Sequence, residues 1–341
     1  MIQTKLAVLI AVVIALTHPF VAADDSHSEV RSKLVRALTD ADAAVRERAA
    51  YRLGVLQWIG AIKPLTERLR VEKDERVRWE IINALGRFGD GAKASVPILI
   101  EIMKDPASLK PRGNMVNVVT NVMAVRTLNE RAALTLSHIG VPAAAPLADL
   151  LGDRKLPKLV RLEAGHALVQ MESDAKAVAP ALATVLSDPD DEIRSQAIEA
   201  LRAIGPGAAR AVPALTRVLD DSSARVRLGA ASALFAIDPK NALTVPRLVA
   251  GLREKDARTR WIATTELERV GPKAAAAVGP LIEVLKEKDP ENRVAAARAL
   301  GAIGRPAREA AHILAKVALE DSVERVREAA AEAAAQLRKQ E

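Results

Sequence analysis

The chain of 341 residues contains no cysteine. This absence excludes disulfide bonds, cysteine nucleophiles and metal sites with thiolate ligands, so the stability of the fold must come from packing. Aromatic residues are also rare, with three Trp, one Tyr and three Phe, whereas alanine and leucine are abundant. Because alanine and leucine are strong helix formers, and small side chains let helices approach closely, the composition predicts an all-α protein.

Long apolar runs are absent except for one at the N-terminus. Lys5 precedes an uninterrupted apolar stretch over residues 6–16, and small residues at 21–23 come before Asp24. This layout is typical of a cleavable secretory signal over residues 1–23, with cleavage between Ala23 and Asp24. The stretch is shorter than the about 20 residues that a bilayer requires, so an uncleaved membrane anchor is the less favoured alternative. We therefore expect an exported protein, periplasmic or secreted, with no membrane span once the signal is removed.

One pattern recurs nine times between about residue 28 and the C-terminus. In residues 226–237 it reads VRLGAASALFAI, where an arginine follows an apolar residue and Ala230, Leu234 and Ile237 continue one helical stripe. We call this position the rung, and it is occupied by Arg46, Arg78, Asn129, Arg161, Arg194, Arg227, Arg260, Arg293 and Arg327. Successive rungs lie 32, 51, 32, 33, 33, 33, 33 and 34 residues apart. Such a period indicates stacked repeats, and the spacing of 51 indicates an insertion over about 105–123 in the third repeat.

Each copy has the signals of two helices joined by a short turn. An aspartate four residues before the rung predicts the N-cap of the second helix in five copies, at Asp42, Asp74, Asp190, Asp256 and Asp289. Gly205, Gly271 and Gly304 predict where that helix ends. A leucine follows the rung by seven residues in eight copies, at Leu53, Leu85, Leu136, Leu168, Leu201, Leu234, Leu267 and Leu300. One helix pair cannot bury both of its apolar stripes, so the copies must stack into an α-α superhelix of about nine two-helix repeats, which forms a single domain over residues 24–341.

The motif Asp190…Ile193-Arg194…Ala197…Leu201…Ile204-Gly205 resembles the HEAT-like repeats first described in phycobilisome lyase subunits. The resemblance covers nearly all of the chain after residue 28, and it implies an armadillo- or HEAT-type solenoid of the kind found in exported bacterial HEAT-repeat proteins. It also implies that the rung arginines belong to the framework, and that the free faces of the second helices form a concave, variable surface.

The rung arginines have two possible roles. A ladder of arginines in register can bind phosphates, but each of these arginines lies beside an apolar stripe and just after an acidic cap. We therefore expect each to bridge to acidic groups of its own or the adjacent turn while its aliphatic stem packs.

The free face of the second helices, which we call the second-helix face, holds the residues three and two before the rung and one, two, five and nine after it. Over the nine copies these positions contain eleven basic and twelve acidic residues. A nucleic-acid groove needs a clear basic excess to neutralise phosphates, so no nucleic-acid partner is expected.

The residues directly after the rungs form what we call the ridge row: Glu47, Trp79, Glu130, Leu162, Ser195, Leu228, Trp261, Val294 and Glu328. Large apolar anchors within a polar rim are typical of protein-binding surfaces. We therefore predict partner contacts at Trp79, Leu162, Leu228, Trp261 and Val294, and at His166 on the same face. The alternative is that these side chains pack against neighbouring helices. The insertion in the third repeat has two possible roles. It adds a further binding ridge beside Trp79, or it is a plain surface loop that the fold tolerates.

Signals for an enzyme are weak. Glu163 and His166 form a single Glu-x-x-His pair, whereas carboxylate-bridged metal sites use that unit twice. Some HEAT-like relatives are di-iron hydroxylases that rely on repeated His-Glu dipeptides, and this sequence has none. Phosphate loops, Gly-x-Ser-x-Gly elbows and His-Glu-x-x-His motifs are also absent. We expect no catalytic residue, metal or cofactor.

The sequence thus predicts an exported, non-enzymatic scaffold that binds a protein or peptide, and it leaves the partner's identity and the oligomeric state open. Two alternatives remain. One is an oxidoreductase or lyase-like relative of the hydroxylase and phycobilin lyase branches, and the other is a structural component of the cell envelope.

Overall fold

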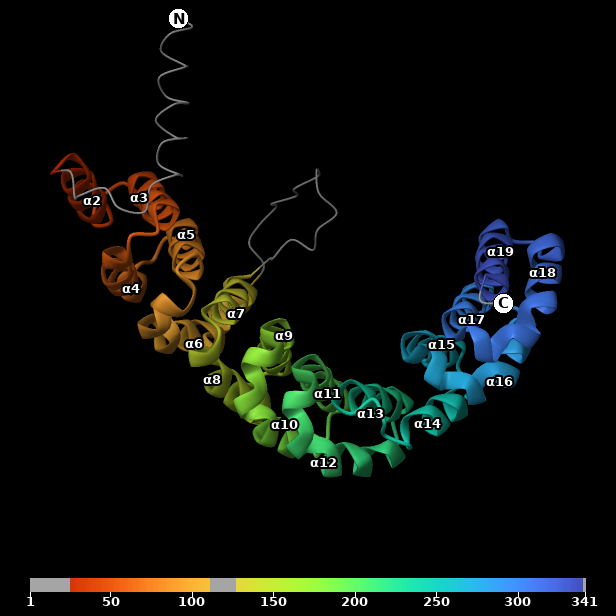
Figure 1. The fold of residues 1–341 in the computed structure, drawn as a ribbon. Helices are drawn as coiled ribbons and strands as arrows, with labels where there is room; N and C mark the ends of the chain where they lie inside the picture. Colours follow the sequence, from red (N-terminus) through yellow and green to blue (C-terminus); the bar gives the residue numbers. More distant parts are fainter. Residues whose placement is uncertain (1–24, 111–126, 340–341) are drawn as a thin grey trace, which may run out of the picture. The chain divides into compact units, whose positions relative to one another are not determined.

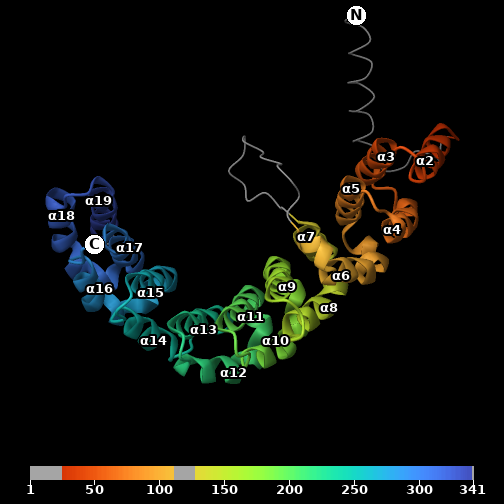
Figure 2. The same ribbon diagram turned by 180° about the vertical axis from the view of Figure 1, so that it is seen from behind.

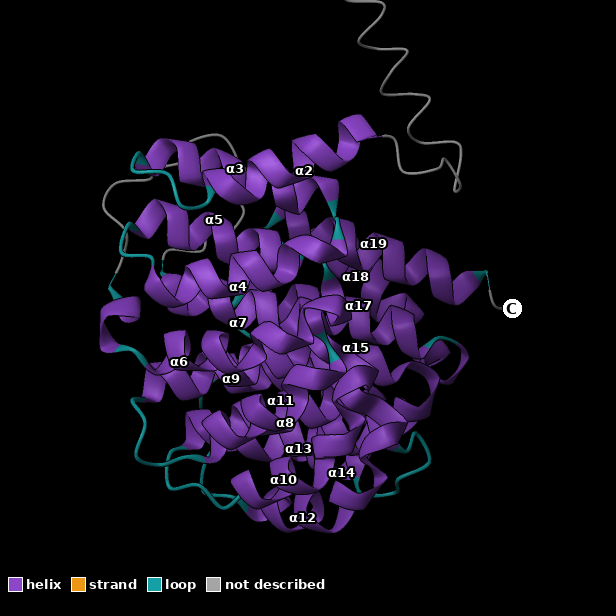
Figure 3. Cartoon of the chain, turned by 90° about the vertical axis from the view of Figure 1, so that its left-hand side faces the viewer, coloured by secondary structure: helices purple, strands orange, loops and turns teal. Residues whose placement is uncertain are grey.

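The computed structural model describes residues 25–110 and 127–339, and regular structure within these ranges consists of helices without a strand. Figure 3 shows the helices and the short loops that connect them. The contacts divide the chain into two compact units, of which the first ends at Ile98 and the second begins at Leu99. The division falls inside helix α6 (Val96–Lys104). The all-α helical repeat architecture that the periodicity predicts is confirmed.

The first unit contains two helix pairs followed by the beginning of α6. Its helices are α2 (Asp25–Ala37), α3 (Ala43–Leu56), α4 (Ile62–Val71) and α5 (Glu75–Gly86), with short 3-10 turns η1 (Ile59–Ala61) and η2 (Gly89–Ser95). The second helices, α3 and α5, pack side by side, and each also packs against the first helix of its own pair.

The second unit continues the same arrangement. Its second helices are α7 (Leu128–Ile139), α9 (Lys158–Met171), α11 (Asp191–Ile204), α13 (Ala224–Ile237), α15 (Ala257–Val270), α17 (Pro290–Ile303) and α19 (Glu324–Arg338). Its first helices are α8 (Val141–Gly152), α10 (Ala179–Val185), α12 (Val212–Arg217), α14 (Thr244–Gly251), α16 (Val278–Val284) and α18 (Ala311–Glu320). Short 3-10 segments lie before or after several first helices: η3 (Pro106–Leu109), η4 (Glu172–Val178), η5 (Gly205–Ala211), η6 (Val218–Asp220), η7 (Gly271–Ala277) and η8 (Arg305–Ala310).

Within the second unit the two kinds of helix form two layers. Each second helix from α9 to α19 contacts the second helix before it as well as the first helix of its own pair. Figures 1 and 2 show the second helices together on the inner side of the bend of this unit and the first helices on its outer side. The second-helix face of this unit is therefore a continuous surface built from one helix of every repeat.

The local signals of the sequence produce the helix boundaries that they predict. All five aspartates occupy N-cap positions, and the carboxylate of each accepts a backbone N–H of the first helical turn. Gly205, Gly271 and Gly304 are C-caps with φ of +63°, +61° and +70°, a backbone conformation that suits glycine. Ser223 differs, because it occupies an N-cap position without a capping bond and its hydroxyl donates to Asp191 instead.

The leucine column forms the centre of the packed layers. All eight of its leucines, and Ala334 in the ninth repeat, have 0 % exposed surface. Full burial of a leucine side chain stabilises a fold by about 1.5–3 kcal/mol relative to its exposure, so this column is a main source of stability in a chain without disulfides.

Several predictions concern parts of the chain that the structure leaves undescribed. The predicted signal with its cleavage site at Ala23 and Asp24 lies outside the described residues, as do residues 111–123, which make up most of the predicted insertion. Among the described helices, none is long and apolar enough to cross a membrane. The prediction of one domain over residues 24–341 stays a prediction.

Candidate binding surface

Six rung arginines bridge to a carboxylate of the next repeat. The pairs are Arg46 with Glu72, Arg161 with Asp188, Arg194 with Asp221, Arg227 with Glu254, Arg260 with Glu287, and Arg293 with Asp321. The last of these is bidentate, with Nε and Nη2 of Arg293 each 2.8 Å from an oxygen of Asp321. Planar guanidinium groups suit such two-point contacts, which are stronger than neutral hydrogen bonds.

Five of these six acidic residues, all in the second unit, also accept a second arginine through their backbone carbonyl. Arg194 donates to the carbonyl of Asp188 at 2.8 Å, and Arg227 donates to that of Asp221 at 2.7 Å. Equivalent bonds join Arg260 to Glu254, Arg293 to Glu287, and Arg327 to Asp321. Arginine and acid therefore alternate from Arg161 to Arg327, and the ladder ties each inter-helix turn of the second unit to the next.

In the first unit, the carboxylate that pairs with a rung arginine is that of Glu72. Its side chain is 1 % exposed and accepts from Arg46, from Arg68 and from the backbone N–H groups of Lys73 and Asp74. Burial alone would raise the pKa of Glu72, but the hydrogen bonds from Arg46, Asp74 N–H and Arg68 outweigh it and lower the pKa to about 2.

The third repeat interrupts the ladder. The Nε of Arg78 is buried and has no hydrogen bond within the described residues. Asn129, which replaces the arginine in this repeat, is fully buried and donates from its Nδ2 to the carbonyl of Met103 at 2.7 Å. The asparagine thus ties its helix to the end of α6 through one neutral hydrogen bond.

The ladder leaves little of the arginines for a ligand. Arg46, Arg161, Arg194 and Arg293 are at most 9 % exposed, and their guanidinium groups are engaged by carboxylates and carbonyls. These arginines stabilise the stack and do not form a surface of phosphate contacts.

Burial separates the members of the ridge row. Trp261 is 42 % exposed, and Trp79 in the first unit and Leu162 in the second are half-buried. Leu228 and Val294 are only 3 % and 5 % exposed. Their predicted role as partner contacts is therefore corrected, because side chains buried in the array pack against neighbouring helices instead.

Close packing of small residues explains both corrections. A Cβ atom added to Gly251 in α14 would lie 2.6 Å from Cδ2 of Leu228 and 2.8 Å from Cβ of Ala263, so Leu228 fills the space where α13, α14 and α15 meet. Val294 lies on α17, which packs extensively against both α15 and α19. The same helix carries buried alanines at 295, 296, 297 and 299, whose small side chains let these neighbours come close.

Two exposed apolar residues of the first unit were missed by the sequence argument. Tyr51 and Val55 on α3 are 50 % and 52 % exposed, and the guanidinium of Arg87 lies over the Tyr51 ring, 5.2 Å from its centroid. They occupy the positions five and nine after the rung Arg46, which belong to the second-helix face. A comparison of those rows by residue size, as was made for the ridge row, would have found them.

His166 lies on the exposed side of α9. Its Nδ1 is 3.7 Å from Oε2 of Glu163, and its side chain is 56 % exposed. The Glu163 carboxylate raises the pKa of His166 above its ordinary value. Within the described ranges, three or more His, Asp or Glu side chains nowhere gather in a way that could hold a metal ion.

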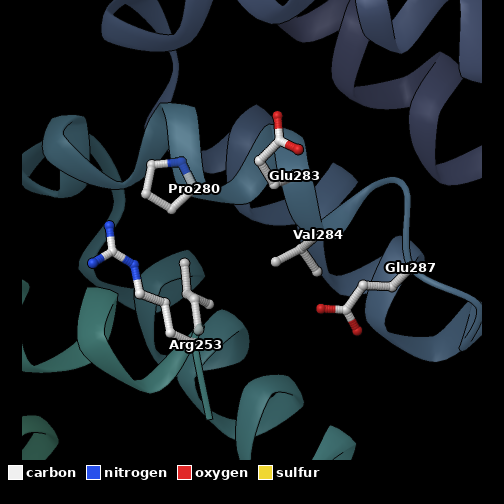
Figure 4. A pocket seen from close by; sticks show the side chains of 6 residues that line it. Arg253, Pro280, Glu283, Val284 and Glu287 are labelled. Carbon is white, nitrogen blue, oxygen red and sulfur yellow. The ribbon is translucent and has the colours of Figure 1, made fainter. Parts of the chain in front are cut away.

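A pocket of about 330 Å³ lies in the first-helix layer of the second unit. It is lined by Leu252 and Arg253 after α14 and by Pro280, Glu283, Val284 and Glu287 in and after α16. Figure 4 shows Arg253 and Pro280 on one side of Val284 and Glu287 on the other. Both carboxylates already have partners, since Glu287 accepts from Arg260 and Asn292, and Glu283 accepts from Lys286. The acidic side chains that line the pocket therefore already have hydrogen-bond partners, and Arg253 lines it as an exposed basic residue.

Comparison with known proteins agrees with this geometry. The family model described as HEAT repeats matches residues 32–113, 154–235 and 245–335. None of the curated proteins compared with the chain matches its sequence. Solved structures with the same fold include a Kap121p mutant, with TM-score 0.61, 14 % identity, and coverage of 91 % of this chain and 37 % of that one. They also include Kap121p bound to Nup53p, with TM-score 0.57, 14 % identity and coverage of 92 % and 42 %, and importin beta, with TM-score 0.61, 13 % identity and coverage of 91 % and 49 %. The chain spans less than half the length of these structures.

Proposed function

The chain belongs to the HEAT-repeat family, and from this premise we propose that it is a non-catalytic scaffold that binds a protein or peptide on its second-helix face. Solenoids of this kind bind through extended surfaces made of many repeats rather than through one deep pocket. The narrower resemblance to repeats of the phycobilisome lyase type stays a prediction.

The exposure of Trp261 is the observation that carries this proposal. The rung ladder and the leucine column use the buried sides of the second helices, whereas Trp261 remains 42 % exposed on α15. A packed scaffold gains little from a half-exposed tryptophan, and tryptophan is enriched at the centres of protein interfaces. Tyr51 and Val55 give the first unit an exposed apolar surface of the same kind.

One of the similar structures supports the kind of ligand. Kap121p, which shares the fold at 14 % identity, is bound to Nup53p in that structure. We take from this likeness only that the fold can accommodate a macromolecular partner.

Two parts of the proposal concern location and chemistry. We place the mature protein in the periplasm or outside the cell, because residues 1–23 have the layout of a cleavable signal. Sequencing the N-terminus of the protein purified from its native cells tests this, and an intact Met1 in a cytoplasmic fraction would overturn it. Metal analysis tests the non-catalytic proposal, since stoichiometric iron would favour the hydroxylase alternative.

Site-specific cross-linking tests the binding surface. A photo-reactive phenylalanine derivative replaces Trp261 in one variant and Leu319 in a control, because Leu319 on the first helix α18 is 83 % exposed. In extracts of the native cell envelope we expect cross-linked partners at position 261 and few at position 319. Equal labelling at both positions, or labelling at neither, contradicts the proposal.

A further inference from the structure

Three exposed arginines of the second-helix face lack a side-chain partner. Arg225 on α13, Arg258 on α15 and Arg298 on α17 are exposed, and within the part of the chain that the structure describes none of them has an ion pair or side-chain hydrogen bond. They come from three consecutive repeats of the second unit. Arg225 and Arg258 hold the same register position, two residues before the rung.

Two carboxylates on these helices are engaged by other donors. Glu266 on α15 accepts from Ser232 at 2.5 Å and is paired with Arg269 at 3.3 Å. Glu291 on α17 is paired with Arg325 at 3.0 Å. The positive charge of the three arginines is therefore not neutralised by an ion pair among the described residues, and it remains available to a ligand.

The neighbouring repeats are arranged differently. On α9 and α11, Lys158 is paired with both Asp190 and Glu192, at 2.8 and 2.7 Å, and Arg202 is paired with Glu199 at 2.6 Å. On α9 and α11 the basic and acidic side chains thus neutralise each other in ion pairs. Within the described part of the second unit, the exposed arginines of the second-helix face that lack an ion pair lie on α13, α15 and α17.

Trp261 lies within this positive region. It follows Arg258 by three residues on α15, so both side chains project from the same side of that helix. Its indole is 42 % exposed, whereas the equivalent Leu228 and Val294 on the adjacent helices are buried. The surface therefore combines one aromatic anchor with arginines from three consecutive repeats, and we call it the arginine–tryptophan patch, made of Arg225, Arg258, Trp261 and Arg298.

We propose that the arginine–tryptophan patch binds an acidic peptide segment that carries an apolar side chain. This proposal rests on the proposed scaffold function and specifies the chemistry of the partner. Arginines form short, charge-assisted hydrogen bonds with carboxylates, and the exposed indole offers an apolar contact to a neighbouring side chain.

The repeat spacing sets the pattern of the acidic residues. Packed helices lie about 8–10 Å apart, and an extended polyproline II chain advances about 3.1 Å per residue with three residues per turn. A peptide that crosses α13, α15 and α17 therefore reaches one repeat further with every third residue. Acidic side chains three residues apart match Arg225 and Arg258, which hold the same register position, whereas Arg298 lies seven positions further along its own helix.

Fluorescence polarisation with two labelled peptides tests the proposal on the full-length protein. One peptide repeats Glu-Pro-Leu four times, and the other repeats Lys-Pro-Leu four times. The patch variant is Arg225→Glu/Arg258→Glu. The matched control is Arg217→Glu/Arg253→Glu, which changes the charge equally at two exposed arginines that lie in and after first helices and have no partner among the described residues.

We expect the wild type and the control to bind the glutamate peptide at least about tenfold more tightly than the lysine peptide. The patch variant reverses this preference, and Trp261→Ala weakens the glutamate peptide about tenfold or more without reversing it. The proposal is overturned if the patch variant still prefers the glutamate peptide, if both peptides bind wild type equally, or if the glutamate peptide does not bind. In each of these cases, persistent cross-linking at position 261 in cell extracts would leave the scaffold function standing.

Discussion

Replacing Glu72 by Gln is expected to destabilise the first unit more than any exposed acid-to-amide change there. The carboxylate is 1 % exposed and joins Arg46, Arg68 and two backbone N–H groups. An amide of the same shape offers one acceptor oxygen and places an NH2 group against arginine donors. Removal of one partner from a buried ion pair costs about 3–5 kcal/mol, because the other charge is left without compensation.

The pKa of Glu72 gives an independent magnitude and a pH dependence. A shift from 4.5 in the unfolded chain to about 2 in the folded one corresponds to about 3 kcal/mol at pH 7. Because the folded pKa is depressed, this stabilisation is present above pH 4.5 and is lost as the pH falls toward 2. At pH 3, between the two pKa values, less than half of this stabilisation remains, so the difference between wild type and Glu72→Gln should shrink by about half.

Urea unfolding at pH 7 and at pH 3 measures this difference. Trp261→Phe serves as the common background, because fluorescence then comes only from Trp58 and Trp79, which belong to the first unit. Glu67→Gln is the control, since Glu67 lies on the same helix α4, is 63 % exposed and is paired only with Lys63, at 3.8 Å. We expect less than about 0.5 kcal/mol from the control.

Either of two results would contradict a stabilising role for the ionised carboxylate of Glu72. One is a loss at pH 7 no greater than that of Glu67→Gln. The other is a loss that is the same at pH 3 as at pH 7, which would mean that the stabilisation does not depend on the ionised carboxylate.

Two further predictions concern the second unit. Arg293→Ala should lower the free energy of unfolding by about 2–3 kcal/mol and Arg327→Ala by about 1 kcal/mol. The reason is that Arg293 makes a bidentate ion pair, whereas Arg327 donates to a carbonyl alone. Urea denaturation compares the two variants, and equal losses of stability would show that the carboxylate bonds add nothing. Gly251→Ala should lower the free energy of unfolding by about 1–3 kcal/mol, because the added methyl would lie 2.6 Å from Leu228. At Gly279 an added methyl meets nothing within 4 Å, so Gly279→Ala should be neutral or stabilising by up to about 1 kcal/mol. Thermal unfolding of this pair tests the packing, which would be looser than described if Gly251→Ala were as stable as Gly279→Ala.

Much of the fold follows from the sequence because its signals are local and repeated. An aspartate four residues before the rung caps a helix in five copies through bonds to the backbone of the next turn, and such bonds need no distant partner. The leucine column is buried in every copy, because a helix pair has no other way to cover its apolar stripes. The HEAT-repeat family membership that these patterns indicate is confirmed.

The binding surface was harder to predict, because exposure at a given register depends on residues of other repeats. Leu228 and Trp261 hold the same register position, yet they are 3 % and 42 % exposed. The difference arises partly at Gly251, whose missing side chain makes room for Leu228 between three helices. A pattern read along one helix contains no information on that approach.

The period, the helix boundaries and the identity of the framework residues follow from the amino-acid order, since each depends on spacing along the chain and on short-range capping. Which arginines form ion pairs within the fold, and which do not, depends on the packing of the repeats. Arg194 and Arg225 are both preceded by acidic or polar turns, but the carboxylate of Asp221 reaches the first across 27 residues, and no acid of the described residues reaches the second. Ion pairs between repeats depend on how closely adjacent turns stack, and stacking is a property of the folded array.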